Sequence, residues 1–384
     1  MKLFHLSDLH IGLRLFNRDL SEDQRYIFDQ IADAARRERP DAILIAGDVY
    51  DKAVPSAEAV ALFDRFVARL RDAAPQSELM IVSGNHDSAP RLNVYRGLLS
   101  QQRVHMIGLP PMKAGEHIER VTLQDVHGPV DFYLLPFVKP SMVRAVVGTD
   151  ENGNNLSYDG SLRRLIALEA IDTSRRNVLV SHQFYLPAGT DADSVARMDG
   201  EVCTVGNIDA IRSDVLDVFD YAALGHIHKP MRVGRDASRY CGTPIQYSVS
   251  EAGQDKGIVV VDMGEKGNVA VNVLPLHPLR QVRVIRGSLQ DVLKQGCGDY
   301  VSVILTDTVD LDILDMRDRL NDAFPRLLEI RREAVHGANY TMDYVPEAVL
   351  DPYELCCAFL NELDEDEQAL LRDVVNAARE VNPA

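Results

Sequence analysis

The chain has 384 residues, a net charge of −17, 46% hydrophobic residues and 26% charged residues, which is typical of a soluble globular protein with two to three domains. The negative net charge argues against a nucleic-acid binder, because most such proteins carry a basic surface patch. Bound cations can, however, reverse the sign of the local charge at a site, and a partner protein can supply the affinity for DNA. No apolar run reaches the ~18 residues of a membrane helix, and the start MKLFHLSDLH has no signal-peptide core, so a cytoplasmic protein without membrane contact is expected.

Residues 1–100 alternate short apolar strands with amphipathic helices. This alternation predicts βαβ units in a buried, largely parallel sheet. Strands are expected at Lys2–Leu6, Ala42–Ala46 and Leu79–Val82, and helices at Ser21–Arg39, capped by Ser21, and at Ser56–Asp72.

After residue 100 the pattern changes to short strands between turn signals. A second sheet facing the first is expected, so residues 1–275 are predicted to form a layered α-β-β-α sandwich of the α/β class. The segment Pro187–Met198 is interpreted as an exposed loop. The strands are expected at Val121–Leu123, Asp131–Leu135, Val178–Val180, Tyr221–Leu224, Arg239–Tyr240, Gly257–Val261 and Val269–Leu274.

Residues 276–335 are predicted to form a small α+β domain with a βαββ-like or βαβαβ-like order. Residues 336–384 then read as a linker and a tail with two helical patterns, which could pack on the chain's own core or on a partner helix. The elements expected in the small domain are strands Gln281–Arg286, Tyr300–Thr306 and Leu327–Arg332 and helices Leu289–Gln295 and Leu311–Phe324.

The five cysteines of the chain form no Cys-x-x-Cys pair. Free thiols in a reducing compartment are therefore expected, rather than disulfides or the thiolate ligands of a structural zinc. They are Cys203, Cys241, Cys297, Cys356 and Cys357.

Short segments with metal-type ligands follow several of the expected strands. The carboxyl ends of strands are where open α/β sheets bind ligands. A mixed set of Asp, Asn and His suits a pair of divalent first-row metals, which can direct water at a phosphate ester. The segments are Asp8-Leu9-His10, Gly47-Asp48, Gly84-Asn85-His86-Asp87, Ser181-His182 and Gly225-His226-Ile227-His228.

Each segment taken singly has an ordinary structural explanation. Gly47-Asp48 can cap a helix, the Gly-Asn-His-Asp segment can form a turn, and His182 can be a buried structural histidine. His226 and His228 are two residues apart and would point to one face of a strand. Fold requirements alone do not account for all five segments in this order, which favours one shared metal site.

This series of motifs resembles the calcineurin-like metallophosphoesterase superfamily. The resemblance implies two divalent metal ions, commonly manganese, with Asp48 as the bridging ligand. Asp8, His10, Asp48 and His228 would bind one ion, and Asp48, Asn85, His182 and His226 the other. The resemblance also implies that His86 is catalytic and acts at the leaving group. Asp87 would hold the His86 ring in place.

Longer segments around these motifs are similar to the SbcD family, the nuclease subunits of SbcCD-type complexes. The resemblance covers residues 1 to about 275. It implies a manganese-dependent nuclease for DNA double-strand-break repair, recombination and replication, acting as an exonuclease on duplex ends and an endonuclease on hairpins and single strands. The segments are HLSDLHIG, GDVYD, GNHD, SHQF, ALGHIHKP and RYCGTPIQYSVSE.

The same resemblance implies partners for the remaining parts of the chain. Residues 276–335 would be a DNA capping domain, and the tail within 336–384 would bind the coiled coil of an SbcC-type ATPase. A homodimer within a heterotetramer would form through the helix after the Gly-Asn-His-Asp segment, although ordinary core packing explains its apolar face equally well. That face holds Leu92, Val94, Tyr95, Leu98 and Leu99.

Three other functions remain open at this point. A small-molecule or cyclic-nucleotide metallophosphodiesterase would share the metals but needs neither the small domain nor the tail. A non-enzymatic scaffold has no need of Asn85 or His86. A protein phosphatase is the weakest alternative, because the segment ends in Asp87 rather than in the Glu associated with that branch.

Overall fold

The computed structural model describes residues 1–187, 189–190, 209–307, 312–333 and 364–380, together with Tyr353, Cys356, Cys357 and Leu360. Most of the expected loop 187–198, the linker after residue 333 and most of the first helical pattern of the tail lie outside these residues. Within them, no helix combines the length and the apolar run needed to cross a membrane. The cysteines within them are free, and Cys203 lies outside them.

The first half of the sandwich is a six-stranded sheet with the strand order β16-β15-β1-β4-β5-β6. Its last four strands run parallel, and β15 and β16 join as an antiparallel edge. The strands are β1 (Lys2–Leu6), β4 (Ala42–Ala46), β5 (Glu78–Val82), β6 (Val104–Ile107), β15 (Lys256–Met263) and β16 (Val269–Leu276).

The second sheet also has six strands, in the order β13-β14-β12-β9-β8-β7. Its four central strands are parallel, and β13 and β7 are antiparallel edges. The strands are β7 (Glu119–Asp125), β8 (Gly128–Leu135), β9 (Arg176–His182), β12 (Tyr221–Gly225), β13 (Met231–Val233) and β14 (Arg235–Tyr240).

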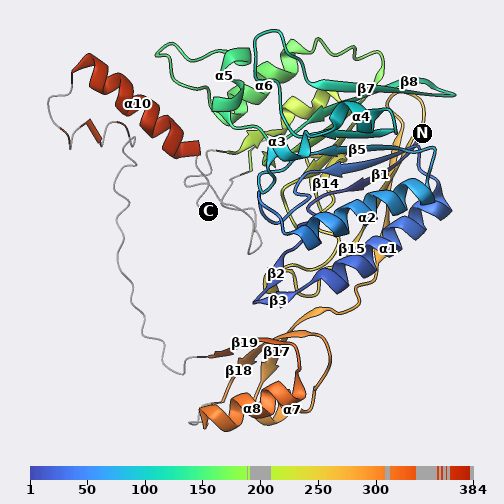
Figure 1. Ribbon diagram of the computed structural model, residues 1–384, viewed down its shortest axis with the longest axis vertical. Coiled ribbons are helices and arrows are strands. Elements are labelled where there is room, and N and C mark those ends of the chain that lie inside the picture. The colour runs from blue at the N-terminus through green and yellow to red at the C-terminus, as the bar shows by residue number, and fades with distance from the viewer. Residues whose placement is uncertain are drawn as a thin grey trace.

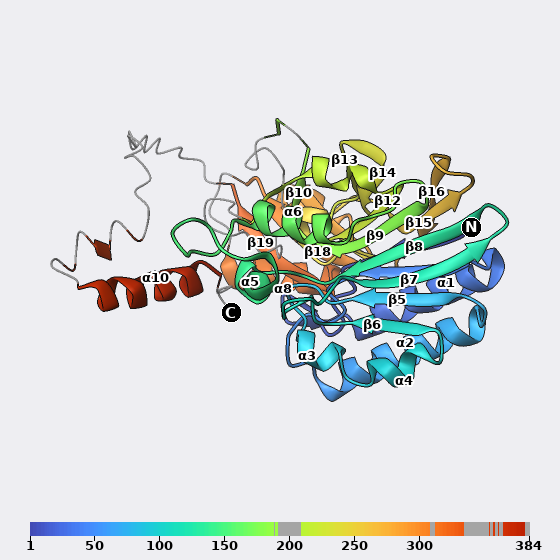
Figure 2. The ribbon, with the colours of Figure 1, turned by 90° about the horizontal axis from the view of Figure 1, so that it is seen from above.

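The two sheets pack face to face, with helices on both outer faces (Figure 1, Figure 2). Leu44 and Val82 of the first sheet meet Phe132 and Val180 of the second in a fully buried core. The outer face of the first sheet is covered by α1 (Ser21–Glu38) and α2 (Ala57–Ala73), and that of the second by α5 (Pro140–Val147) and α6 (Tyr158–Leu168). The predicted α-β-β-α fold class is confirmed.

The expected start of the first helix needs a correction. The N-cap of α1 is Leu20, and Ser21 is already the first helical residue. The Asp19 carboxylate instead accepts a hydrogen bond of 2.7 Å from the Ser21 amide. Ser56 does cap α2, since its hydroxyl accepts from the Ala59 amide.

Short elements link these layers. They are β2 (Arg14–Leu15), β3 (Arg18–Asp19), α3 (Ala89–Leu92), α4 (Arg96–Ser100), β10 (Tyr185–Leu186), β11 (Ile211–Arg212) and the 3-10 turns η3 (Ser213–Val218) and η4 (Val249–Glu251).

A smaller unit follows the sandwich, at the bottom of Figure 1. Its three parallel strands stand in the order β17-β18-β19, so of the two topologies left open by the sequence it has the βαβαβ one. It has a hydrophobic core of its own. Its elements are β17 (Val282–Gly287), α7 (Leu289–Leu293), β18 (Tyr300–Leu305), α8 (Ile313–Ala323) and β19 (Leu327–Arg332).

The second helical pattern of the tail forms α10 (Glu365–Glu380), which lies against α5. Val375 on this helix is buried, whereas Leu370 and Val374 are exposed by 66% and 56%. The helix therefore leaves part of its apolar surface uncovered within the described part of the chain.

Candidate metal centre

All five ligand segments lie where the sequence predicts them, at the carboxyl ends of β1, β4, β5, β9 and β12. The first two segments are joined through the main chain. The Asp8 amide donates to the Gly47 carbonyl at 3.0 Å, and the His10 amide donates to the Asp48 carbonyl at 3.0 Å. Neighbouring strands of a parallel sheet thus bring distant parts of the chain to one edge.

The main chain at these segments adopts conformations that side chains other than glycine rarely adopt. The φ angles are 53° at Asp8, 40° at His10, 48° at Asp48 and 104° at His226. Each such residue costs about 1–3 kcal/mol, and the surrounding structure must impose the conformation. Clustering of this strain at one place is typical of a functional site, where it directs side chains inward.

Close approach of these loops also requires glycine at two positions. A Cβ atom at Gly84 would overlap the carboxylate and main chain of Asp48, and one at Gly225 would overlap the Ala46 carbonyl. The missing side chains let the ends of β4, β5 and β12 lie in direct contact.

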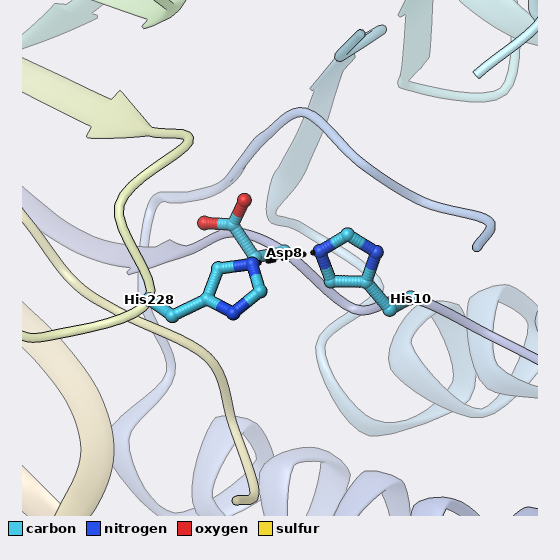
Figure 3. A group of neighbouring side chains, drawn as sticks. All are labelled: Asp8, His10 and His228. Atoms are coloured by element: carbon cyan, nitrogen blue, oxygen red, sulfur yellow. Dashed lines mark hydrogen bonds between the residues drawn. The ribbon is translucent and has the colours of Figure 1, made fainter. Parts of the chain in front are cut away.

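Asp8, His10 and His228 form the first group of converging donors (Figure 3). Each offers a ligand atom within 4.8 Å of the others, and all are buried. The Nε2 atoms of His10 and His228 lie 3.1 Å apart. Ser7 donates to the Asp8 carboxylate from the neighbouring position.

A second group of donors gathers around Asn85. Its Oδ1 atom lies 3.0 Å from Nε2 of His182 and 2.9 Å from Nδ1 of His226. Asp48 lies between the two groups, because its Oδ2 atom is 3.2 Å from Nε2 of His182 and 3.7 Å from Nε2 of His10. This is the location expected of a bridging ligand.

The two histidines after β12 do not share a strand face, contrary to the expectation from their spacing. The strand ends at Gly225, so both histidines lie in the following loop. The His226 ring faces Asn85, whereas the His228 ring faces His10. One short loop thereby contributes one imidazole to each group of donors.

The protonation states of these groups follow from burial and mutual charge. Burial raises the pKa of Asp8 and lowers that of His10 well below its usual value. Burial would also raise the pKa of Asp48, but His182 and His86 hold it well below its usual range. Burial would lower the pKa of His182, but Asp48 raises it to about 9. Without bound cations, Asp48 is therefore ionised and His182 is protonated, and the two side chains neutralise each other as an ion pair.

His86 and Asp87 have separate contacts. The His86 amide donates to Asp48 Oδ1 at 2.9 Å, and its ring Nδ1 donates to the Asp51 carbonyl at 2.9 Å. The Asp87 carboxylate accepts from the amides of Val49, Tyr50 and Gly84 at 2.9–3.0 Å. The expectation that Asp87 holds the His86 ring is therefore not met: the Asp51 carbonyl does so, and Asp87 ties the loops after β4 and β5 together.

The residues present fit two divalent metal ions. Carboxylate, amide and imidazole donors converge from five loops, and the set matches first-row metals rather than soft thiolate-binding ions. The short approach between the Nε2 atoms of His10 and His228 also fits a cation, since lone pairs aimed at one point repel each other unless a proton or an ion lies between them.

Sequence reasoning missed two residues that support the site. Gln24 of α1 donates to the His10 carbonyl at 2.8 Å, and Glu251 accepts from Nδ1 of His228 at 3.3 Å. Neither lies near a ligand in the sequence. Glu251 ends the segment RYCGTPIQYSVSE, but nothing in that segment assigned it a contact with His228, which the fold reveals. Two basic residues next to the ligand segments in the sequence, Arg91 and Lys229, are exposed, and Arg197 lies outside the described residues.

Comparison with known protein families agrees with this geometry. Residues 1–230 match the family described as Calcineurin-like phosphoesterase. Similar solved structures include a dimetal phosphatase from Danio rerio, with 12% identity, a TM-score of 0.42, and coverage of 72% of this chain and 96% of that one. Phosphopantetheinyl hydrolase from Mycobacterium tuberculosis has 18% identity, a TM-score of 0.34, and coverage of 63% and 90%. Because the family match spans more than half of the chain, this protein belongs to the calcineurin-like phosphoesterase family of metal-dependent hydrolases.

Proposed function

We propose that the chain is a manganese-dependent nuclease of the SbcD type that hydrolyses phosphodiester bonds of DNA. The observation that carries the proposal is the site itself. A donor side chain stands at each ligand position that the family resemblance implies, and His86 lies beside them. The choice of DNA is supported by the segments around the ligands that resemble the SbcD family and by the small unit packed beside α1.

The residues of the site have distinct tasks in this reaction. Two manganese ions held by the donor groups would polarise the phosphodiester and lower the pKa of an attacking water. The His86 ring lies 4.9 Å from the His10 ring, centroid to centroid, so it borders the first group of donors. Since Nδ1 of His86 donates to the Asp51 carbonyl, the ring must also be protonated at Nε2 to act as an acid, and Nε2 is then the atom that passes its proton to the leaving oxygen.

The hairpin of β2 and β3 supports a nucleic-acid substrate. It begins a few residues after His10, and its tip carries Phe16, which is 47% exposed. Arg14 and Arg18 lie two residues before and after Phe16 in the chain and are also exposed, although each donates one hydrogen bond to a carbonyl, that of Asn17 or of Leu327. A hairpin with an exposed aromatic ring at its tip and two exposed arginines in its strands is suited to stacking on a base while the cations contact phosphates.

The surface also supports the proposed partners. Of the expected apolar face, Leu92 is buried in the core and Leu99 packs against it, so core packing explains that part. Val94, Tyr95 and Leu98 are exposed by 49%, 74% and 63%, and these three suit a homodimer interface. The uncovered Leu370 and Val374 of α10 suit docking on the coiled coil of an SbcC-type ATPase.

The deciding assay uses an end-labelled DNA hairpin with manganese, the ATPase partner and ATP. We expect cleavage by the wild type and a loss of about 10²–10⁴-fold in His86→Ala, the range for a general acid. His105→Ala is the matched control, because that ring contacts Glu78 on β5 rather than the donor groups. Intact DNA together with hydrolysis of a cyclic nucleotide would overturn the nuclease assignment in favour of a small-molecule phosphodiesterase.

A further inference from the structure

Glu251, in the turn η4, lies in the interior behind the metal centre and is fully buried. Its Oε1 atom accepts from Nδ1 of His228 at 3.3 Å and from Ser248 at 3.1 Å. Its Oε2 atom accepts from Thr243 at 2.7 Å and from Lys256 at 2.6 Å. Both oxygens of this carboxylate are therefore held in place by neighbouring donors.

Lys256 extends the same network to the main chain of the ligand loop. This lysine is only 4% exposed, and its Nζ donates to the His228 carbonyl at 3.1 Å as well as to Glu251. One buried ion pair thus holds His228 at both its ring and its backbone. A buried ion pair is weak evidence for stability, because desolvation of the charges offsets much of their attraction. A role in fixing the adjacent metal ligand His228 explains the buried Glu251–Lys256 pair better.

The hydrogen bond to Glu251 selects the ring nitrogen that faces the metal centre. Donation from Nδ1 leaves the lone pair of His228 on Nε2, which points at His10 and Asp8. A carboxylate acceptor also makes an imidazole more basic than a neutral acceptor does. His182 in the other group donates its Nδ1 to the Ala46 carbonyl at 2.7 Å, which is a neutral acceptor.

We propose that Glu251, with its charge balanced by Lys256, is a positioning residue that strengthens metal binding at the position formed by Asp8, His10 and His228. This deepens the proposed function, since it rests on the two-metal site, but it does not depend on which phosphoester is cleaved. We therefore expect metal affinity to depend on the Glu251 carboxylate at this position and not at the position around Asn85.

The test is calorimetric titration of metal-free protein with Mn²⁺ alone, without substrate. We expect Glu251→Gln to weaken one of the two binding events on the order of 10–100-fold, as loss of a hydrogen-bonding partner of a metal ligand does, and to leave the other nearly unchanged. Because this variant removes the carboxylate that balances the buried charge of Lys256, the double variant Glu251→Gln with Lys256→Met is measured as well. We expect it to recover thermal stability but not metal affinity.

Asp125→Asn provides the matched control. It breaks the ion pair with Arg176, which is 3% exposed and lies at the opposite end of β9 from His182. We expect lower stability with unchanged affinity for both ions. The proposal is overturned if the double variant binds two ions as the wild type does, or if Asp125→Asn weakens the same binding event equally. Wild type that binds two ions but leaves DNA intact would refute the nuclease and not this inference.

Discussion

Asp23 and Gln24 are consecutive buried residues of α1 that bond to different parts of the protein. Asp23 Oδ2 accepts from Arg280 and from the Tyr300 hydroxyl, both at 2.8 Å, at the entry to the small unit. Gln24 donates to the carbonyls of Leu9 and His10 at 3.3 and 2.8 Å. The first turn of one helix therefore contacts both the small unit and the metal centre.

Asp23→Ala should loosen the small unit from the sandwich. Tyr300 and Arg280 would lose a buried acceptor, which typically costs about 1–3 kcal/mol. We expect faster limited proteolysis between residues 276 and 282 and a lower free energy of unfolding. Asp29→Ala is the control, because that residue of α1 pairs with Arg69 at the surface. Equal proteolysis of both variants would contradict the docking role of Asp23.

Gln24→Leu should affect the metal centre instead. The substitution keeps the size of the side chain but removes the donor to the His10 carbonyl, so the ligand loop is less well fixed. We expect Mn²⁺ affinity to fall by about tenfold. Gln30→Leu on the same helix removes a bond to the His277 carbonyl and should leave affinity as it is. Unchanged affinity in Gln24→Leu would show that the loop is fixed without this residue.

The charge of His182 predicts a pH dependence for the metal-free protein. Its pKa rises from 6.5 to about 9 in the folded state, although burial alone would lower it, because Asp48 is close. This contribution to stability is thus complete below pH 6.5 and is lost as pH rises through about 9. Metal binding requires a neutral ring, so binding below pH 9 should release a proton.

Calorimetry in buffers of different ionisation enthalpy measures that proton release. We expect it near neutral pH and expect it to disappear above about pH 9. Release that is absent in the wild type at neutral pH would contradict the Asp48–His182 ion pair. An unchanged release in His182→Gln would assign the proton to another group.

The apolar surface at α4 predicts self-association. Leu98→Glu places a charge where Val94, Tyr95 and Leu98 are exposed, and we expect it to convert a dimer to a monomer in light-scattering measurements. Val126→Glu is the control, because Val126 is 94% exposed in the turn between β7 and β8. A Leu98→Glu protein that remains dimeric would place the interface elsewhere.

Much of the site could be predicted from sequence because its ligands directly follow strands. Asp8, Asp48 and Asn85 come after apolar runs, and parallel strands end at a common edge. The βαβ pattern likewise predicted the layers. The prediction from spacing was wrong at His226 and His228, because β12 ends at Gly225 and neither histidine lies on the strand.

The supporting residues could not be predicted for a different reason. Gln24 donates to Tyr247, which lies 223 residues away, and Glu251 bonds to His228 across 23 residues. Such contacts depend on how α1, β15 and η4 pack together. Tyr247 and Glu251 both lie in the segment RYCGTPIQYSVSE, but no periodicity or spacing within it shows which residues they contact. Ser21 shows the same limit locally, since Leu20 and not Ser21 became the cap of α1.

The central claim is that two metal ions share Asp48. Anomalous diffraction at the manganese edge, from crystals grown with Mn²⁺, tests it most directly. The account predicts two peaks on either side of the Asp48 carboxylate, one next to His10 and His228 and one next to Asn85 and His182. A single peak, or peaks away from these side chains, would contradict it.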